Sequence, residues 1–393
     1  MIKREHYLQQ IRPFYESDLI KVITGIRRCG KSVIMDQIET ELRLAGKKTL
    51  KLNFEDRSVS ARIRTVDDLI SHVNAHLGSE KLYVFLDEVQ AVEHWNLACR
   101  SLRLQNVSLF ITGSNSKLLS KEFTKQLSGR YVSFRVRPFV FREIQEYAKE
   151  LKQNYSIADY LVYGGFPQAI EFPTKEARRR YLNDLDDTIV INDILNRYKI
   201  RKDSLFKRLV NFVMLSNARI FSANSVQKVL KGQGLDCSLN TILKYLSYLE
   251  EAYAVSAIDL YSTKAKRELK YYRKLYLEDV SFNSIRQTDG HWDITHNLEN
   301  IVYNELLFRG YSLFVFRVDD REIDFLAEKD NRQYLVQVAF SIAEEDTYRR
   351  EFALFNKLDQ SREKIIITND EFDFSTSTVR HIKLKDFLLS DTL

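Results

Sequence analysis

Residues 25–32 read Gly25-Ile26-Arg27-Arg28-Cys29-Gly30-Lys31-Ser32, and this stretch decides the fold. A β-rich apolar run at 19–24 precedes it, and a segment with helical spacing follows at 32–45. Glycines let a loop wrap closely around a phosphate chain, and the start of a helix adds backbone N–H donors and a favourable dipole. The sequence therefore predicts a phosphate-binding loop between a strand and a helix.

The loop assigns roles to individual residues. Lys31 reaches the β- and γ-phosphates of ATP, and Ser32 supplies a hydroxyl to Mg²⁺. The expected nucleotide-binding residues are consecutive along the chain: Gly25, Ile26, Arg27, Arg28, Cys29, Gly30, Lys31, Ser32 and Val33.

A second apolar run at 82–86 ends in two acids, Asp87 and Glu88. Beside a phosphate loop, Asp87 would hold Mg²⁺ through water and Glu88 would polarise the water that attacks the γ-phosphate. Acids also favour a helix N-terminus, so the pair alone is also consistent with the start of a helix. Its position after the phosphate loop favours the catalytic interpretation.

Two further polar residues follow later strands. Asn115 comes after the run at 107–112, where it would sit beside the γ-phosphate or belong to a Gly-Ser-Asn turn. Arg130 precedes the run at 131–136, where it would act as an arginine finger across a subunit boundary or be an ordinary surface arginine. The pattern leaves both alternatives open for each residue.

Length and composition indicate an ordinary globular protein of several domains. The chain has 393 residues, with 44% hydrophobic and 29% charged residues, and only 12 glycines and 4 prolines. No apolar run of membrane-spanning length and no signal peptide stands out. The cysteine pattern fits a reducing cytoplasm, where the protein is expected. Its 3 cysteines lie far apart without ligand spacing, which argues against a zinc site or a disulfide framework.

The order of elements predicts four regions. Strand-like runs at 19–24, 49–54, 82–86, 107–112 and 131–136 alternate with helical segments and predict a parallel sheet in a P-loop ATPase domain at 1–137. Residues 138–202 are expected to form a helical lid. A winged helix-turn-helix is expected at 203–284 and an endonuclease-like α/β domain at 285–393.

The middle region carries a concentrated positive charge. Net charge is +6, and the stretch from Lys264 to Lys274 holds six basic residues against one acid, together with Tyr271 and Tyr272. A recognition helix at 238–254 and a wing around this stretch would suit double-stranded DNA. Winged helices also dock proteins, and Glu250 and Glu251 oppose phosphate binding, so a protein client stays an alternative.

The C-terminal region follows the layout of an endonuclease core with half of its site missing. Glu299 and Asp324 stand where the first acids of such a site belong. Gln337 and Ala339 occupy the positions of the remaining acid and the lysine, so metal-dependent cleavage is not expected. Glu299 and Asp324 are therefore either a relic metal site or ordinary surface acids.

Several motifs together resemble the bacterial and archaeal AAA-type ATPases that join an AAA_14 domain to a C-terminal DUF4143 region. Besides the loop, they are Asn53-Phe54-Glu55-Asp56, Leu86-Asp87-Glu88-Val89-Gln90 with Trp95, Ile111-Thr112-Gly113-Ser114-Asn115, Leu127-Ser128-Gly129-Arg130, Tyr163-Gly164-Gly165-Phe166-Pro167 and Asn192-Asp193-Ile194. The resemblance spans nearly the whole chain and implies ATP binding.

Three functions are consistent with these features. The favoured one is a Mg²⁺-dependent ATPase that drives a DNA-binding and docking module. It is expected to act as a homo-oligomer and to have no membrane contact. The alternative is a nucleotide-gated switch with slow turnover. An ATP-dependent nuclease is disfavoured by Gln337 and Ala339.

Overall fold

The computed structural model describes residues 1–113, 127, 129–261, 273–287, 291–318, 321–356, 358 and 361–393. Contacts divide the chain into two compact units. The first comprises Met1–Pro138 with Glu251–Tyr253, and the second comprises Phe139–Glu250 with Ala254–Leu393. None of the helices in the described ranges is both long and apolar enough to cross a membrane.

The first unit is built on a five-stranded parallel sheet with the order β2-β3-β4-β1-β5. The strands are β1 (Ile20–Thr24), β2 (Lys48–Asn53), β3 (Leu82–Asp87), β4 (Val107–Gly113) and β5 (Tyr131–Arg135). β1, β3 and β4 are buried along their whole length, as expected for strands covered on both faces. Because β4 lies between β1 and β3, its carboxyl end separates the predicted phosphate loop from Asp87.

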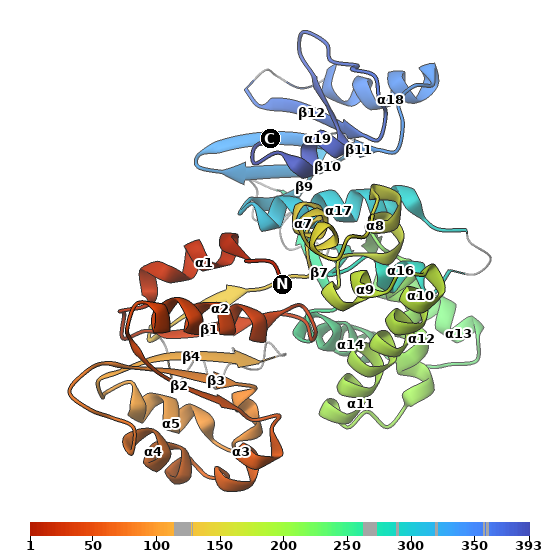
Figure 1. Cartoon of the computed structure of the whole chain (residues 1–393). Coiled ribbons are helices and arrows are strands. Elements are labelled where there is room, and N and C mark those ends of the chain that lie inside the picture. The colour runs from red at the N-terminus through yellow and green to blue at the C-terminus, as the bar shows by residue number, and fades with distance from the viewer. Residues whose placement is uncertain are drawn as a thin grey trace. The chain divides into compact units, whose positions relative to one another are not determined.

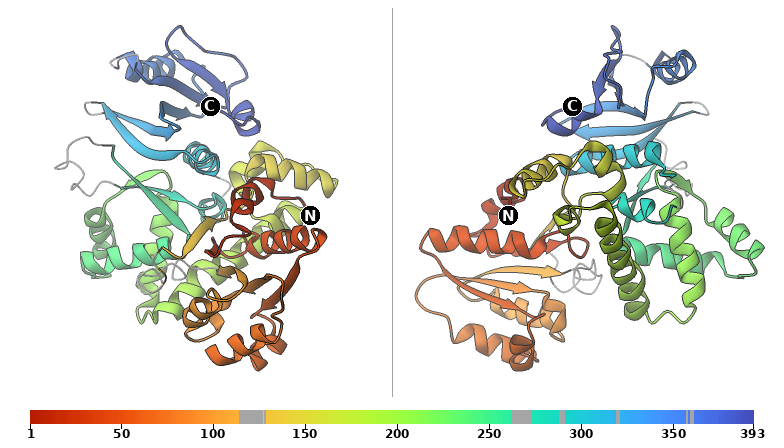
Figure 2. Two further views of the ribbon diagram at one scale, coloured as in Figure 1. Left: turned by 90° about the vertical axis from the view of Figure 1, so that its left-hand side faces the viewer. Right: turned by 45° about the vertical axis from the view of Figure 1, so that its right-hand side comes forward.

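Helices cover both faces of this sheet (Figure 1; Figure 2). α1 (Glu5–Ile11) and α2 (Lys31–Leu44) lie on one face, and α3 (Arg57–Arg62), α4 (Val66–Asn74) and α5 (Trp95–Leu102) lie on the other. Leu69, Val73 and Leu102 of α4 and α5 join the apolar core beneath β1, β3 and β4. This layering supports the strand ends on which the candidate site residues stand.

The second unit begins with helices that match the expected helical region. They are α7 (Phe141–Glu150), α8 (Ile157–Tyr163), α9 (Pro167–Glu171), α10 (Lys175–Asp186), the π-helical segment η4 (Asp187–Asn192) and α11 (Asp193–Tyr198). Ser156 caps α8 by accepting a hydrogen bond from the Asp159 N–H.

A helix–strand–helix–helix–strand–strand arrangement follows. Its elements are α12 (Asp203–Leu215), β6 (Arg219–Phe221), α13 (Ala223–Gly232), α14 (Leu239–Glu251), β7 (Val255–Asp259) and β8 (Arg273–Leu277). The strands form an antiparallel sheet with the order β6-β8-β7. Ser238 accepts a hydrogen bond from the Thr241 N–H at the start of α14, as the helix-start pattern predicts.

The C-terminal part of the second unit packs around one buried helix. α16 (Ser281–Ser284) is followed by α17 (Ile294–Phe308), which packs against α8, β8, β9 and β11. A five-stranded mixed sheet has the order β13-β12-β11-β10-β9. Its strands are β9 (Ser312–Val318), β10 (Arg321–Lys329), β11 (Arg332–Ala339), β12 (Glu363–Thr368) and β13 (Arg380–Lys383), with α18 (Glu345–Asn356) and α19 (Leu384–Leu389) alongside. Figure 2 shows α17 lying along these strands.

The predicted elements agree with the structure in type and approximate extent. All five expected strands of the N-terminal sheet are present and parallel, and the predicted helix at 32–45 is α2. The short strands β6 and β13 were not predicted from the sequence. Residues 262–272, which include most of the expected wing, lie outside the described residues.

Candidate functional site

The predicted phosphate loop lies between β1 and α2 and has a backbone that only particular residues allow. Gly25 has φ +143°, and a Cβ there would collide with the Val136 carbonyl oxygen. Gly30, which precedes α2, has φ +96°, and Arg28 also takes a positive φ of 67°. The loop therefore has the close-wrapped shape that phosphate binding needs.

Lys31 points back across this loop. Its ammonium donates hydrogen bonds to the carbonyl oxygens of Gly25, at 3.2 Å, and Ile26, at 3.1 Å. Lys31 is buried, whereas Ser32 beside it is exposed at the start of α2. A cation and a hydroxyl thus stand together at the helix N-terminus, where anions are favoured.

Cys29 lies in the loop but faces the protein interior. Its side chain is fully buried, and the thiol donates a hydrogen bond to the Val136 carbonyl oxygen at 3.3 Å. The fold itself therefore already covers this thiol. Among the loop residues, Arg27 is half-buried and forms an ion pair with Glu55 at 3.6 Å.

Arg4 supports the loop from beneath. It is 1% exposed, and its Nη1 donates hydrogen bonds to the carbonyl oxygens of Cys29, at 2.9 Å, and Arg137, at 3.0 Å. One guanidinium therefore ties the loop to the segment after β5. Nothing in the sequence near Arg4 indicates this role, because both partners are distant along the chain.

Asp87 and Glu88 stand at the carboxyl end of β3, one strand away from the loop. Asp87 is buried and accepts a hydrogen bond from the Thr112 hydroxyl at the end of β4. The same Thr112 oxygen accepts a hydrogen bond from the Glu88 N–H at 3.1 Å. Glu88 is half-buried, takes a left-handed backbone with φ 53°, and accepts a hydrogen bond from Gln90. Thr112 thus joins both acids, a function that the sequence analysis missed although the residue stood in a quoted motif.

The two weaker candidates have different outcomes. Asn115 lies outside the described residues. Arg130 accepts a hydrogen bond through its carbonyl oxygen from the Ile20 N–H, at the start of β1. Because β1 and β5 are parallel, Arg130 lies at the amino ends of these strands, whereas Gly25 lies at their carboxyl ends. The two residues are therefore roughly 15 Å apart, at about 3.3 Å per residue of strand. At the loop's own edge stand Arg135 and Arg137 instead.

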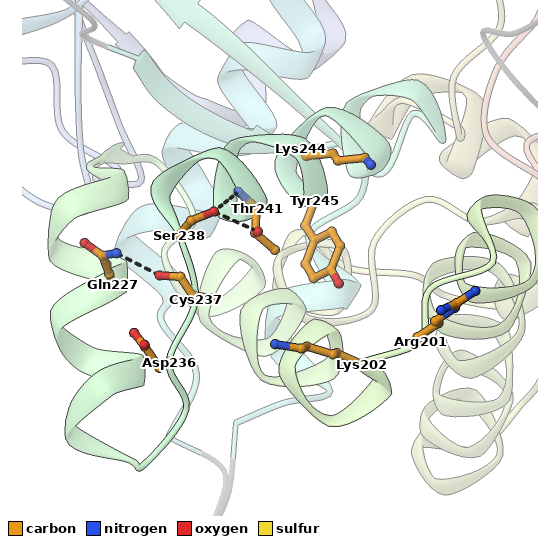
Figure 3. Close-up of a pocket in the computed structure, with 9 residues that line it drawn as sticks. All are labelled: Arg201, Lys202, Gln227, Asp236, Cys237, Ser238, Thr241, Lys244 and Tyr245. Carbon is orange, nitrogen blue, oxygen red and sulfur yellow. Dashed lines mark hydrogen bonds between the residues drawn. The ribbon is translucent and has the colours of Figure 1, made fainter.

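A second polar site surrounds the start of α14 (Figure 3). A cavity of about 680 Å³ is lined by three basic side chains, one acid and several hydroxyl, amide and thiol groups. The lining residues are Arg201, Lys202, Lys244, Asp236, Gln227, Cys237, Ser238, Thr241 and Tyr245. Figure 3 shows Lys202 extending into the space between Asp236 and Tyr245. The three basic side chains are exposed, so this cavity offers cations and a helix N-terminus to solvent.

The basic stretch after β7 is less uniformly exposed than its sequence suggests. Residues 264–272 lie outside the described residues. Arg273 donates a hydrogen bond to Glu250 at 3.3 Å, so this acid of α14 is paired. Lys274 is 4% exposed and faces the C-terminal domain, which corrects its assignment to a basic surface.

Lys274 lies among the acids of the endonuclease-like layout. Its ammonium is 2.7 Å from Glu299, 2.7 Å from Glu322 and 3.0 Å from Asp324. Glu299 and Asp324 are buried, so the interpretation of both as ordinary surface acids is wrong. Across the described ranges, no group of three or more His, Cys, Asp or Glu side chains is arranged to hold a metal ion.

Burial and charge act together on these groups. Burial raises the pKa of Glu299 to about 8, with Asp324 adding to the rise and Lys274 opposing it. Burial alone would lower the pKa of Lys274, but Asp324, Glu299 and Glu322 outweigh it and hold the pKa well above its usual value.

Comparisons with known proteins place these features in one family. The AAA domain family AAA_14 matches residues 17–145, and two domains of unknown function, DUF8612 and DUF4143, match residues 154–286 and 295–387. The first unit therefore has the fold of an AAA-type P-loop ATPase, as expected.

The chain is also similar to whole proteins. An uncharacterised protein of Haemophilus influenzae is 34% identical over 95% of this chain and 94% of its own length. One from Methanocaldococcus jannaschii is 30% identical over 90% and 82%. A solved structure of a Walker-type ATPase from Pyrococcus abyssi is 16% identical, covers 73% of this chain and 96% of its own, and has a TM-score of 0.48. The chain belongs to the bacterial and archaeal family in which an AAA_14 ATPase domain is joined to a C-terminal DUF4143 region.

Proposed function

We propose that this protein is a Mg²⁺-dependent ATPase. The observation that carries the proposal is the meeting of three strand ends at one sheet edge: the loop after β1, Asp87 and Glu88 after β3, and Thr112 between them on β4. Such an arrangement supplies phosphate donors, acidic oxygens and a polar link between them in one place.

The residues divide the chemistry among themselves. The loop backbone binds the phosphates of ATP. The Lys31 ammonium, which donates hydrogen bonds to the Gly25 and Ile26 carbonyl oxygens, donates to phosphate oxygens instead when ATP binds. Ser32 and Asp87 are the groups that would hold Mg²⁺, which neutralises charge on the transferred phosphoryl group when bound. Glu88 orients and polarises the attacking water. Thr112 fixes Asp87 relative to the Glu88 backbone.

The proposal extends to double-stranded DNA through a winged helix formed by α12, α13, α14 and the sheet β6-β8-β7. The cations around the start of α14 support this extension, because Arg201, Lys202 and Lys244 are positioned to neutralise phosphates. Pairing of Glu250 with Arg273 also removes one objection to an anionic partner.

The four-region division at 1–137, 138–202, 203–284 and 285–393 is part of the same proposal, with residues 138–202 as a lid. So is a homo-oligomer in which Arg130 of one subunit reaches the nucleotide of another. The place of Arg130 at the edge away from its own loop favours action between subunits over action within one. A protein client is the partner that the same winged helix would take in place of DNA.

Steady-state ATP hydrolysis with Mg²⁺ tests the proposal. We expect native protein to hydrolyse ATP, Glu88→Gln to bind ATP with hydrolysis lowered by a hundredfold or more (about 10²–10⁴ for a lost general base), and Lys31→Ala to lose binding. Stimulation of native hydrolysis by double-stranded DNA would support the winged-helix assignment. ATP binding without turnover in native protein would instead favour the nucleotide-gated switch.

A further inference from the structure

The acidic cluster of the C-terminal domain contains a positive charge from another part of the chain. Lys274 is the second residue of β8 in the three-stranded sheet, whereas Glu299 is on α17 and Asp324 is on β10. The Lys274 ammonium lies within 3.0 Å of a carboxylate oxygen from each, and Glu322 adds a third carboxylate at 2.7 Å. Both Lys274 and Asp324 are nearly inaccessible to solvent.

The oxygens that a metal ion would need are engaged by hydrogen-bond donors of the chain. Glu299 Oε1 accepts from Lys274 and also from the Tyr276 hydroxyl at 2.6 Å. Asp324 Oδ1 accepts from Lys274 at 3.0 Å, and its Oδ2 accepts from the Val338 N–H at 2.9 Å. Gln337, at the position of the missing acid, accepts from the Asp324 N–H at 3.2 Å.

We infer that Lys274 is the resident cation of this cluster and occupies the place that a divalent metal ion would take between Glu299 and Asp324. Two cations cannot share one small buried site, because their repulsion is strong where water is excluded. The C-terminal domain therefore keeps an acidic cluster that binds the protein's own ammonium group and excludes Mg²⁺.

This ion cluster also fastens β8 to the C-terminal domain. Further along β8, the Leu277 N–H donates to Asn300 Oδ1 at 2.7 Å, and Asn300 Nδ2 donates to the Leu277 carbonyl oxygen at 2.9 Å. Lys274 anchors the start of the strand and Asn300 anchors its end. β8 begins directly after residues 262–272, so the basic segment is joined at one end to a strand that α17 and β10 hold in place.

The test measures Mn²⁺ binding by nucleotide-free protein, using electron paramagnetic resonance of free Mn²⁺. Four chains are compared: native, Asp324→Asn, Lys274→Met, and the double variant Lys274→Met with Asp324→Asn. Mn²⁺ bound at the phosphate loop is common to all four and cancels in the comparison. Lys274→Met replaces the ammonium by an unbranched apolar side chain one atom shorter, which removes the charge and its N–H donors, and circular dichroism verifies the fold.

We expect native and Asp324→Asn proteins to bind Mn²⁺ equally. Lys274→Met should gain about one Mn²⁺ per chain, and the added Asp324→Asn change should remove it. The melting temperature of the single variant Lys274→Met should fall below that of native protein and recover with Mn²⁺. A Mn²⁺ site in native protein that Asp324→Asn abolishes would overturn the inference, and so would a folded Lys274→Met chain that gains no site. If Lys274→Met does not fold, the native and Asp324→Asn pair still decides.

Discussion

The buried carboxylate of Asp279 accepts a hydrogen bond from the Gly165 N–H at 2.7 Å, which joins two segments more than a hundred residues apart. A Cβ on the adjacent Gly164 would collide with the same carboxylate, and one on Gly165 would collide with the Phe139 carbonyl oxygen. The glycine pair in Tyr163-Gly164-Gly165-Phe166-Pro167 is thus explained by close packing against Asp279 and needs no ligand.

The burial of Asp279 predicts a pH dependence of stability. Burial raises the pKa of Asp279 to about 6, against an ordinary 3.8, so the folded chain binds this proton more tightly than the unfolded chain. The protonated Asp279 side chain therefore contributes fully to the free energy of unfolding below about pH 4. This contribution falls by about 3 kcal/mol as the pH rises to about 6, at roughly 1.4 kcal/mol per pKa unit. The melting-temperature difference between native protein and Asp279→Asn, measured across this range, should change in that direction. A constant difference would contradict the shift.

Thr112 should matter for turnover more than for ATP binding. Thr112→Val keeps the shape but removes the hydroxyl that bonds Asp87 and the Glu88 N–H. We expect kcat to fall about tenfold, since each lost hydrogen bond of this kind is worth roughly 1–3 kcal/mol, while the Kd for ATP changes little. Thr40→Val, on an exposed position of α2, is the matched control and should behave as native protein. Unchanged kcat in Thr112→Val would remove Thr112 from the site.

The basic side chains at the start of α14 predict a salt signature. Lys244→Gln should weaken binding to double-stranded DNA and lower the slope of log K against log salt by about 0.9, the value for one phosphate contact. Lys228→Gln changes an exposed lysine of α13 outside the cavity lining and should leave both quantities almost unaltered. Equal losses in the two variants would indicate nonspecific attraction rather than a contact at this cavity.

Arg130 predicts complementation between inactive subunits. Arg130 lies at the end of the strands away from its own loop, so Arg130→Ala should leave the variant's own nucleotide site intact. It should lower hydrolysis because the neighbouring subunit's site loses its arginine finger. Mixing Arg130→Ala with Lys31→Ala should restore part of the activity, since one subunit supplies the loop and the other the arginine. The mixture is assayed against each variant alone. Activity no greater than their sum would argue against an arginine finger acting between subunits.

Sequence reasoning succeeded where function and burial impose local patterns. The strands at 20–24 and 82–87 are mostly apolar because both faces of their sheet are covered, and the loop between β1 and α2 has a fixed spacing. It missed the role of Arg4, whose partners lie 25 and 133 residues away. It also missed the position of Lys274, whose partners lie 25 to 50 residues away. β6 was missed because it has only three residues, two of them exposed. Contacts of this kind depend on tertiary folding and leave no periodic pattern.

Arg4 gives the nucleotide site an unusual dependence on the N-terminal arm. The Arg4 guanidinium donates hydrogen bonds to the Cys29 and Arg137 carbonyl oxygens, so the loop is ordered when the chain folds. The entropic cost of ordering the loop therefore does not reduce the free energy of ATP binding. Docking of residues before α1 and competence to bind nucleotide are then one event. Heating should therefore abolish ATP binding as soon as this arm detaches, before the sheet beneath it unfolds.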